Sequence, residues 1–406
     1  MHQSHHCMAR RAPGPGAGFW VAAAVVAHTL WTSAAPSMTY PLYASAWGLT
    51  PTQTTGIFAV YPIVVVAVLV VLGDLSDYAG RRATMLLGLS ASLAGTLLFA
   101  AAPGVMWLYA GRAFMGIGVG LSAGPATAAM FEFAAESRGA QAARFAGALN
   151  TSAQASGLAA AVLVGGGLIQ YAPAPMHLNF WVLAAVLALI AVFAWRLPRR
   201  QAQRPYRDWR FRPVLIPAAL RPAFLVSMTA VTTAYAIGPM MLSVGAQIVR
   251  DLVGSANVFV NGMAIGLFAF VWGVTGLLIR GIAHGKAMRL GAVATLAAMA
   301  ALVLAASLHS LPWFVAVVVA SGMGYSLLFT GGIGSINSHA LPAQRGGVLS
   351  ALYLVGYLVQ GALALGLGVL ATAFGLRTAV EAGAGAVALL ALASLLLALK
   401  MPAARA

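Results

Sequence analysis

Charged side chains are scarce in this chain of 406 residues: they make up 7% of it, whereas a soluble domain carries roughly 25%. Acidic side chains are the scarcest, with 7 Asp and Glu against 23 Lys and Arg. The single cysteine, Cys7, excludes an internal disulfide framework. The shortage of charge excludes an ordinary water-soluble fold. A content of 61% hydrophobic residues and a mean hydropathy of +0.90 indicate a membrane protein.

Apolar runs separated by Pro, Gly and charged residues predict twelve membrane-spanning helices. Because a span needs about 20 apolar residues, twelve spans with short connections leave no room for a large soluble domain. The first run, from Phe19, is followed directly by further spans, so we expect it to stay as a helix and not to be cleaved as a signal. The expected spans are 19–40, 54–72, 83–102, 107–131, 145–169, 179–195, 223–246, 257–280, 287–307, 312–336, 348–373 and 378–399.

The basic residues fall almost entirely on one side of these spans. Of the 23 Lys and Arg residues, 20 lie in the tails and in the connections on the same side, Arg250 and Arg377 lie on the other side, and Arg112 lies within a span. Because Lys and Arg are enriched in cytoplasmic loops, we expect a multi-pass protein of the bacterial inner membrane with both termini in the cytoplasm. The same asymmetry argues against a nucleic-acid-binding surface as the cause of the net charge of +16.

The richest basic segment lies at the midpoint of the chain and divides it into two halves of six spans. We therefore predict an all-α integral membrane protein with two six-helix bundles, 19–196 and 223–400, a basic cytoplasmic linker, 197–222, and short cytoplasmic tails, 1–18 and 401–406. Hydrophobic residues alternate with arginines in the linker. Two interpretations of it stay open: contact with anionic membrane lipids, or a solvated tether.

The connection between the second and third spans carries a specific motif, Gly73-Asp74-Leu75-Ser76-Asp77-Tyr78-Ala79-Gly80-Arg81-Arg82. It resembles the signature loop of the major facilitator superfamily. The fourth span contains Arg112 followed by spaced glycines such as Gly116, which resembles the second motif of that family. The resemblance extends over nearly the whole chain. It implies two pseudo-symmetric six-helix bundles around a central cavity, working by alternating access.

The loop has a physical interpretation as a conformational lock. Gly73 and Gly80 permit a tight reversal and close approach of helices. Asp77 is a carboxylate at the membrane edge, suited to the N–H groups of a helix N-terminus. The resemblance implies that this helix is the eleventh span, which begins near Gly346 and Gly347, and that the contact closes the cytoplasmic side in one conformation.

The two arginines of the loop receive different interpretations. Arg81 is expected to pair with an acid at the cytoplasmic end of the fourth span, where Glu132 and Glu136 are available. For Arg82 the simpler interpretation is favoured, namely that it helps to set the topology.

By resemblance, the first, fourth, seventh and tenth spans line the central cavity. Polar residues on these spans, and on the fifth and eleventh, recur at intervals of three or four, so each set shares one helix face. For any single hydroxyl, hydrogen bonding between helices is the simpler interpretation. The candidate cavity residues are His28, Thr32, Arg112, Asn150, Gln154, Thr232, Tyr235, Tyr325, Tyr353 and Gln360, and Tyr357 shares a face of the eleventh span with the last two.

Two of these residues are candidates for coupling transport to protons. For Arg112, proton coupling or holding the fourth helix is favoured, anionic substrate binding comes second, and snorkelling to the outer headgroups is a third role. No acid lies near the middle of a span, so His28 is the remaining mid-span group that titrates near neutral pH in water. The simpler interpretation of His28 is a structural hydrogen bond. Gly116 permits close packing or bending of the fourth helix.

These features predict a secondary active transporter of a small solute, coupled to protons. The nearly uncharged, aromatic candidate lining favours export of a neutral or lipophilic compound, with import or facilitated passage of a sugar or organic anion as the alternative. An intramembrane enzyme is less favoured because no nucleophile, acid–base pair or metal-ligand cluster converges, and a non-transporting receptor stays open.

No cofactor is expected. The sequence has no phosphate-binding loop for ATP, and the tail residues His2, His5, His6 and Cys7 are not expected to bind a metal. Nucleic acid is not expected as a partner, and the transporter is expected to function as a monomer.

Overall fold

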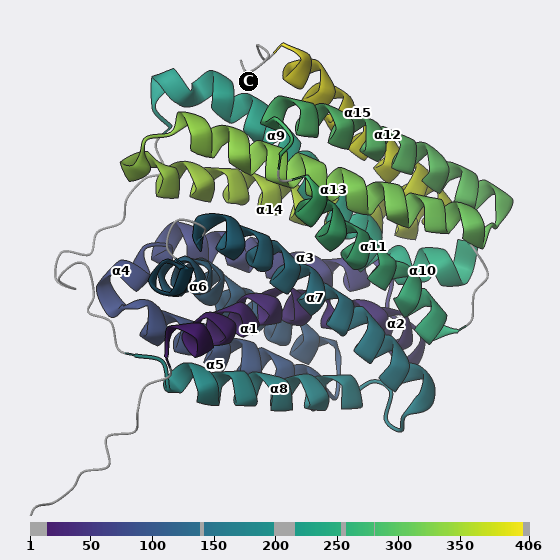
Figure 1. Ribbon diagram of the computed structural model, residues 1–406. Helices are drawn as coiled ribbons and strands as arrows, with labels where there is room; N and C mark the ends of the chain where they lie inside the picture. The colour runs from purple at the N-terminus through teal and green to yellow at the C-terminus, as the bar shows by residue number, and fades with distance from the viewer. Residues whose placement is uncertain (1–13, 139–141, 199–215, 253–256, 280, 401–406) are drawn as a thin grey trace, which may run out of the picture.

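Nearly all of the part of the chain that the structure describes is helical (Figure 1). The structure is a computed structural model that describes residues 14–138, 142–198, 216–252, 257–279 and 281–400. Within these residues, twelve helical segments are long and apolar enough to cross a membrane, which confirms the twelve predicted spans. Residues 199–215 of the predicted linker, 1–13 of the predicted N-terminal tail and the whole C-terminal tail lie outside the described residues, and 15–18 of the predicted N-terminal tail belong to the first helix.

The first half contains six spans. Its helices are α1 (Pro15–Ala34), a 3₁₀ turn η1 (Ala35–Met38), α2 (Tyr40–Trp47), α3 (Pro51–Leu72), α4 (Leu75–Ala79), α5 (Arg81–Ala100), α6 (Val105–Arg138), α7 (Ala142–Tyr171) and α8 (Leu178–Trp195).

The second half repeats this arrangement. Its helices are η4 (Ala218–Leu220), α9 (Arg221–Gly238), a π-helical turn η5 (Pro239–Ser243), α10 (Gly245–Gln247), a second π-helical turn η6 (Ile248–Leu252), α11 (Val258–Leu278), α12 (His284–Leu308), α13 (Leu311–His339), α14 (Pro342–Phe374) and α15 (Leu376–Leu399).

The first and seventh spans are present where 19–40 and 223–246 are predicted, but each changes its helix type part-way along, which the apolar runs do not predict. The first span changes from α-helix to a 3₁₀ turn at Ala35, next to Pro36, and the seventh changes to a π-helical turn at Pro239. Proline has no backbone N–H to donate, so regular helical hydrogen bonding is interrupted at each position. The break falls in the first span of both halves, in keeping with their pseudo-symmetry.

The two halves form two bundles that lie side by side, with α1 to α8 in the lower one and α9 to α15 in the upper one (Figure 1). They contact each other mainly through two helix pairs, α3 with α14 and α7 with α11. We call the end of the molecule that carries Arg81, Arg82 and Lys400 the basic side, and the other end the opposite side. In Figure 1 α4 lies toward the basic side, and α2 and α10 lie toward the opposite side.

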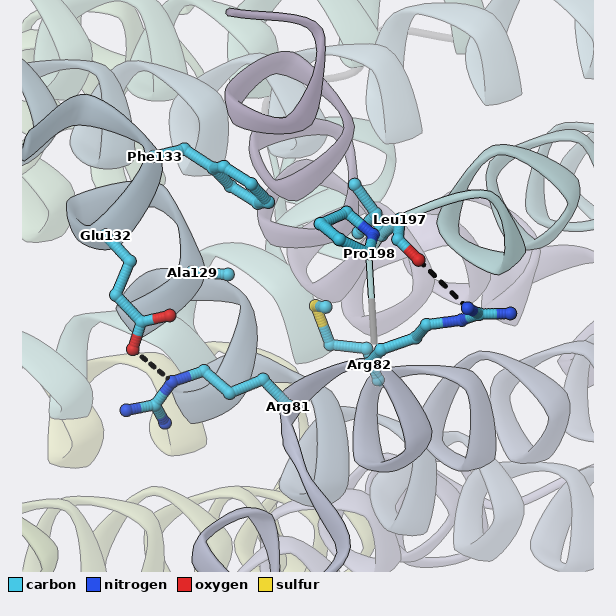
Figure 2. Close-up of a pocket in the computed structure, with 8 residues that line it drawn as sticks. Arg81, Arg82, Ala129, Glu132, Phe133, Leu197 and Pro198 are labelled. Carbon is cyan, nitrogen blue, oxygen red and sulfur yellow. Dashed lines mark hydrogen bonds and ion pairs between the residues drawn. The ribbon is translucent and has the colours of Figure 1, made fainter. Parts of the chain in front are cut away.

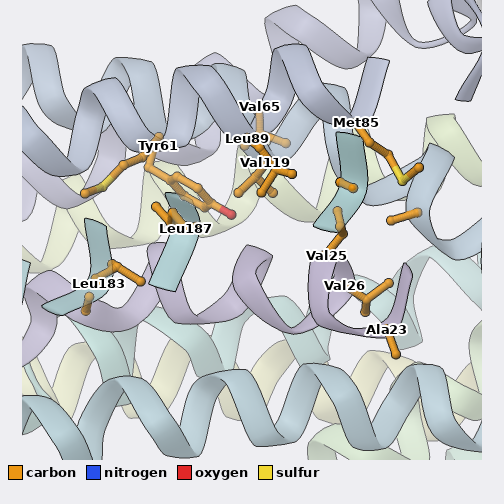
Figure 3. Close-up of a cluster of buried hydrophobic side chains, with 14 of the residues drawn as sticks. Ala23, Val25, Val26, Tyr61, Val65, Met85, Leu89, Val119, Leu183 and Leu187 are labelled. Atoms are coloured by element: carbon orange, nitrogen blue, oxygen red, sulfur yellow. The ribbon is translucent and has the colours of Figure 1, made fainter. Parts of the chain in front are cut away.

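Each bundle has an apolar core. In the first bundle, residues such as Val26, Leu89, Val119 and Leu187 bring α1, α5, α6 and α8 together (Figure 3). This core also includes Ala364 of α14, so it continues across the interface between the halves. Because lipid does not drive apolar side chains together as water does, close packing of small residues supplies much of the attraction between such helices.

Candidate functional site

The signature loop folds as the short helix α4 between two spans. Gly80 follows α4 with a φ of 84° and turns the chain into α5. A φ in this range strains residues other than glycine, so the turn requires Gly80. Gly73 has an ordinary helical φ of −60°, and its expected part in the reversal does not depend on a left-handed conformation.

Arg81 forms an ion pair with the fourth span. Its Nε lies 2.6 Å from Oε1 of Glu132 in α6 (Figure 2), and its Nη1 lies 3.4 Å from the hydroxyl of Ser76. Both members of the pair are largely shielded, with 23% and 31% of their side chains exposed. The structure therefore brings Arg81 to Glu132, and Glu136 lies one turn further along α6 on the exposed surface.

Arg82 points the other way, toward the end of the sixth span. Its Nη1 donates to the carbonyl oxygen of Leu197 at 2.9 Å (Figure 2), and its guanidinium lies 5.2 Å from the ring centroid of Trp195. A small pocket of about 20 Å³ between the two arginines has room for about one water molecule. Arg82 thus joins α5 to the end of α8, a structural role beyond setting topology.

Asp77 lies in α4 with its carboxylate partly exposed and forms no side-chain hydrogen bond or ion pair with another described residue. Its expected partner is the start of the eleventh span. The side chains of 342–346 lie outside the described part of the chain, so the contact stays a prediction.

Arg112 is fully buried, which contradicts the snorkelling role. Its Nη1 donates to the carbonyl oxygen of Ser33 at 2.8 Å, and its Nη2 lies 3.4 Å from the carbonyl oxygen of Phe58. The guanidinium also lies over the rings of Tyr61, at 4.6 Å, and of Phe58, at 5.5 Å. Cation–π contacts of this kind stabilise a desolvated cation.

The two carbonyl groups that Arg112 contacts have no hydrogen-bond donor within their own helices. Phe58 lies four residues before Pro62, which has no N–H to complete the helical hydrogen bond. Ser33 lies in the last turn of α1, where carbonyl groups have no intrahelical partner. Arg112 therefore holds the fourth span against the irregular points of the first and second spans.

Gly116 lies one turn after Arg112 and allows this approach. A Cβ atom at Gly116 would stand 2.9 Å from the carbonyl oxygen of Tyr61 and 3.0 Å from Val64. Those distances are shorter than ordinary contacts, so a side chain there would push α6 away from α3. The residue serves close packing, one of the two roles expected for it.

His28 lies inside the first bundle. Its Nδ1 contacts the carbonyl oxygen of Val25 in its own helix, and its Nε2 lies 3.4 Å from the hydroxyl of Ser92 in α5. The imidazole is buried and faces α5, whereas a cavity between the halves would require it to face the second bundle.

Aromatic rings from five helices form one continuous cluster where the two halves meet. The rings of Tyr235 and Tyr357 are 4.9 Å apart, and those of Trp272 and Tyr325 are 4.6 Å apart. Tyr61 joins from the first half, with its ring edge-to-face on Tyr357 at 6.5 Å. We call the following residues the aromatic cluster: Tyr61, Tyr235, Phe268, Trp272, Tyr325, Phe329, Tyr353 and Tyr357.

The aromatic cluster connects the cores of the two bundles and keeps part of its surface uncovered. Tyr357 packs against the core of the first half and Tyr325 against that of the second. Five of its residues are only half-buried, namely Tyr235, Tyr325, Phe329, Tyr353 and Tyr357. Aromatic residues that are partly uncovered at an interface are suited to packing against a planar solute.

Two further candidates lie one turn from the aromatic cluster. Gln360 is on α14, with its amide nitrogen 3.2 Å from the point where a Cβ on Gly238 would stand. Thr232 is buried on α9, and its hydroxyl has no hydrogen-bond partner among the described residues. The structure thus brings the candidates of the second half together at the aromatic cluster.

The first-half candidates are more dispersed. The hydroxyl of Thr127 donates to Oδ1 of Asn150 at 3.1 Å, which joins α6 to α7 within one bundle. Gln154 lies half-buried one turn further on α7. Thr32 is buried, and its hydroxyl has no partner in the described part of the chain.

Hydrogen bonds join the two halves at the opposite side. The hydroxyl of Thr52, at the start of α3, donates to the carbonyl oxygen of Gly368 at 3.1 Å, and its backbone N–H donates to the hydroxyl of Thr372 at 3.0 Å. On the other helix pair, the backbone N–H of Val258 donates to the amide oxygen of Gln170 at 2.9 Å. We call these contacts the opposite-side seam.

A family comparison agrees with this architecture. The model of the Major Facilitator Superfamily matches residues 20–364, well over half of the chain. The chain belongs to this superfamily. The resemblance of the loop at 73–82 is thereby confirmed at the level of the family.

Solved structures of superfamily transporters share the fold at low sequence identity. A mutant of the nucleoside transporter NupG gives a TM-score of 0.75 at 12% identity, covering 93% of this chain and 98% of that one. A bacterial homologue of the human lysosomal transporter Spinster, inward-facing and unoccupied, gives 0.72 at 14%, covering 95% and 97%. A mutant of the peptide transporter POT gives 0.73 at 16%, covering 94% of each. No curated protein matches the sequence.

Four residues of the aromatic cluster are absent from the polar helix faces predicted from sequence, namely Tyr61, Phe268, Trp272 and Phe329. A signal for most of them is present, because three spans each carry two aromatic residues four positions apart, which places both on one helix face. The pairs are Phe268 with Trp272, Tyr325 with Phe329, and Tyr353 with Tyr357. Tyr61, the contribution of the first half, has no such partner.

Proposed function

We propose that this membrane transporter moves a neutral or lipophilic solute with a planar, aromatic surface, and that the solute binds at the aromatic cluster. The observation that carries the proposal is the group of half-buried rings where the two halves meet. A solute bound at such a place contacts both bundles, so their relative movement exposes it to one side and then to the other.

The charges of the spans support a neutral solute. All 7 acidic residues of the sequence lie at or beyond the ends of spans, so no carboxylate is placed to hold a cationic substrate at the cluster. Arg112 is buried under two rings and two carbonyl groups, and this arrangement disfavours the anionic-substrate role.

For direction and energy source, the proposal is export driven by protons across a bacterial inner membrane, with the basic side in the cytoplasm. His28 is the proposed proton carrier, and α1 and α5 would have to separate for water to reach it. The burial of His28 favours a second candidate, an uncoupled facilitator.

The ion pair of Arg81 with Glu132 supports the lock proposal. In this proposal, the ion pair of Arg81 with Glu132 holds α5 on α6. Asp77 contacts the start of the eleventh span when the basic side of the molecule closes. The division into bundles 19–196 and 223–400 is part of the same proposal, since the lock acts between them.

A binding screen followed by flux tests the proposal. The purified protein is screened by thermal shift against neutral aromatic compounds, sugars, amino acids and organic acids, because a ligand of the folded state raises its apparent stability. Each hit is then measured in liposomes with and without a pH gradient. We expect an aromatic hit whose affinity falls about tenfold in Tyr357→Ala, since aromatic contacts contribute about 1 kcal/mol or more beyond buried area.

Matched variants separate the outcomes. Tyr171→Ala removes a ring that is 71% exposed at the far end of α7, and we expect wild-type affinity. Equal affinity of Tyr357→Ala and the wild type would show that the solute binds elsewhere. A flux that is the same with and without the pH gradient would favour the uncoupled facilitator.

The same flux assay tests the lock. Asp77→Asn is expected to slow flux while the abundance of the protein stays unchanged.

A further inference from the structure

A groove of about 630 Å³ lies on the outside of the first bundle, at the basic side. It is formed where the start of α5 meets the end of α8, two helices that pack against each other. Its walls include Trp195, with 61% of its surface exposed, and Leu87, with 54% exposed. Because both helices are membrane spans, the groove lies at the boundary between the hydrocarbon and the water.

One end of the groove is positively charged. Arg82 lines it, with the guanidinium held beside Trp195 and the carbonyl oxygen of Leu197. Gly80, which also lines the groove, precedes the first turn of α5 and supplies no side-chain cap. The N–H groups of a first helical turn favour negative charge, and they add to the field of the arginine.

The other end of the groove is mostly apolar. Leu86, Leu87 and Ser90 of α5 line it. Ser90 lies three and four positions after the two leucines, so the three residues share one side of the helix and mark a path from the membrane edge toward the interior of the membrane. The ligand that fits both ends carries an anionic group at the membrane surface and a hydrocarbon chain below it. Tryptophan at headgroup level is typical of such a boundary.

We propose that this groove binds one anionic phospholipid, with its phosphate at Arg82 and an acyl chain along Leu86 and Leu87. The site is independent of the solute site at the aromatic cluster. The bound phosphate would stabilise the corner where α5, α8 and the start of the linker meet, one residue from Arg81 of the lock. The corresponding position in the second half is Ala287, after Gly285-Lys286, so a single site is expected in each molecule.

Native mass spectrometry of the full chain in mild detergent tests the proposal. The probe is dioleoyl phosphatidylglycerol, with dioleoyl phosphatidylcholine and inorganic phosphate as comparisons. We expect the wild type to retain one phosphatidylglycerol more tightly than phosphatidylcholine. We expect Arg82→Gln to bind it about fivefold more weakly, which corresponds to about 1 kcal/mol for one basic residue at an anionic surface.

Two further variants keep the test decisive if Arg82→Gln is poorly folded. Leu87→Trp fills the apolar end while keeping the arginine, and we expect weaker lipid retention. Leu389→Trp places the same ring at a residue of α15 that is 69% exposed, and we expect wild-type retention. Equal binding of the two lipids, equal retention by Leu87→Trp and Leu389→Trp, or displacement by inorganic phosphate alone would overturn the proposal.

Discussion

At the scale of single residues, Arg112 shows how a cation is accommodated in the middle of a bundle. Among the described residues no acid pairs with it. Two carbonyl oxygens and two ring faces surround the guanidinium instead. A guanidinium presents several N–H groups in one plane and a flat face, so it can reach carbonyls on two helices while it stacks on a ring, whereas a compact ammonium group has neither the planar fork nor the flat face. The identity of the residue as arginine is therefore tied to its geometry as well as to its charge.

This argument predicts the effect of Arg112→Lys. The charge is kept, but one of the two carbonyl contacts and the stacking on Tyr61 are lost, so we expect a loss of about 2 kcal/mol in stability, the range for hydrogen bonds to a charged group. Unfolding in detergent measures the loss. Arg377→Lys, at a residue exposed on the opposite side, is the control and should stay within about 0.5 kcal/mol of the wild type. If both variants unfold together with the wild type, the carbonyl contacts do not contribute.

At the scale of helices, the irregular points of the first and second spans are places where one span depends on another. Pro62 leaves the carbonyl of Phe58 without its helical donor, and the donor comes from a residue 54 positions further along the chain. The proline thus interrupts a hydrogen bond within one helix, and the replacement donor comes from another helix. A proline inside a transmembrane helix is tolerated when a neighbouring helix satisfies the freed group in this way.

A double-mutant cycle tests this dependence. Arg112→Met leaves the carbonyl of Phe58 unpaired, and Pro62→Ala restores the N–H that would bond to it within α3. We expect Pro62→Ala to recover about 1 kcal/mol in the Arg112→Met background, the typical net value of one hydrogen bond. Pro125→Ala, at another proline inside a helix, is the matched control and should add independently to Arg112→Met. If the stability effects of Pro62→Ala and Arg112→Met also add independently, Arg112 does not compensate for the N–H that Pro62 lacks.

The helices also show what the sequence can and cannot predict. The twelve spans follow from apolar runs because each span must be long and uncharged to cross the bilayer. The breaks at Pro36 and Pro239 are missed because hydropathy does not change at a proline inside an apolar run. The aromatic cluster is missed in part because Phe268 and Trp272 are ordinary components of an apolar span, and only the fold brings them to Tyr325.

At the scale of the whole molecule, the two halves are held together by close helix contacts as well as by side-chain hydrogen bonds. On one helix pair, a Cβ on Gly262 of α11 would stand 2.5 Å from the carbonyl oxygen of Val162 in α7. On the other pair, a Cβ on Gly368 of α14 would stand 1.7 Å from the hydroxyl oxygen of Thr55 in α3. The opposite-side seam therefore needs glycine on one helix of each pair.

A transporter that works by alternating access must open and close this seam, so a side chain at Gly368 should bias the molecule toward the state in which the seam is open. We expect Gly368→Val to separate the opposite ends of α3 and α14 and to slow flux. Spin labels at Ser45→Cys and Thr378→Cys, in a Cys7→Ser background, report the separation as a longer distance between the halves. Gly366→Val is the matched control, because nothing lies within 4 Å of a Cβ there. An unchanged distance in Gly368→Val would mean that the close approach at this glycine does not control the movement of the halves.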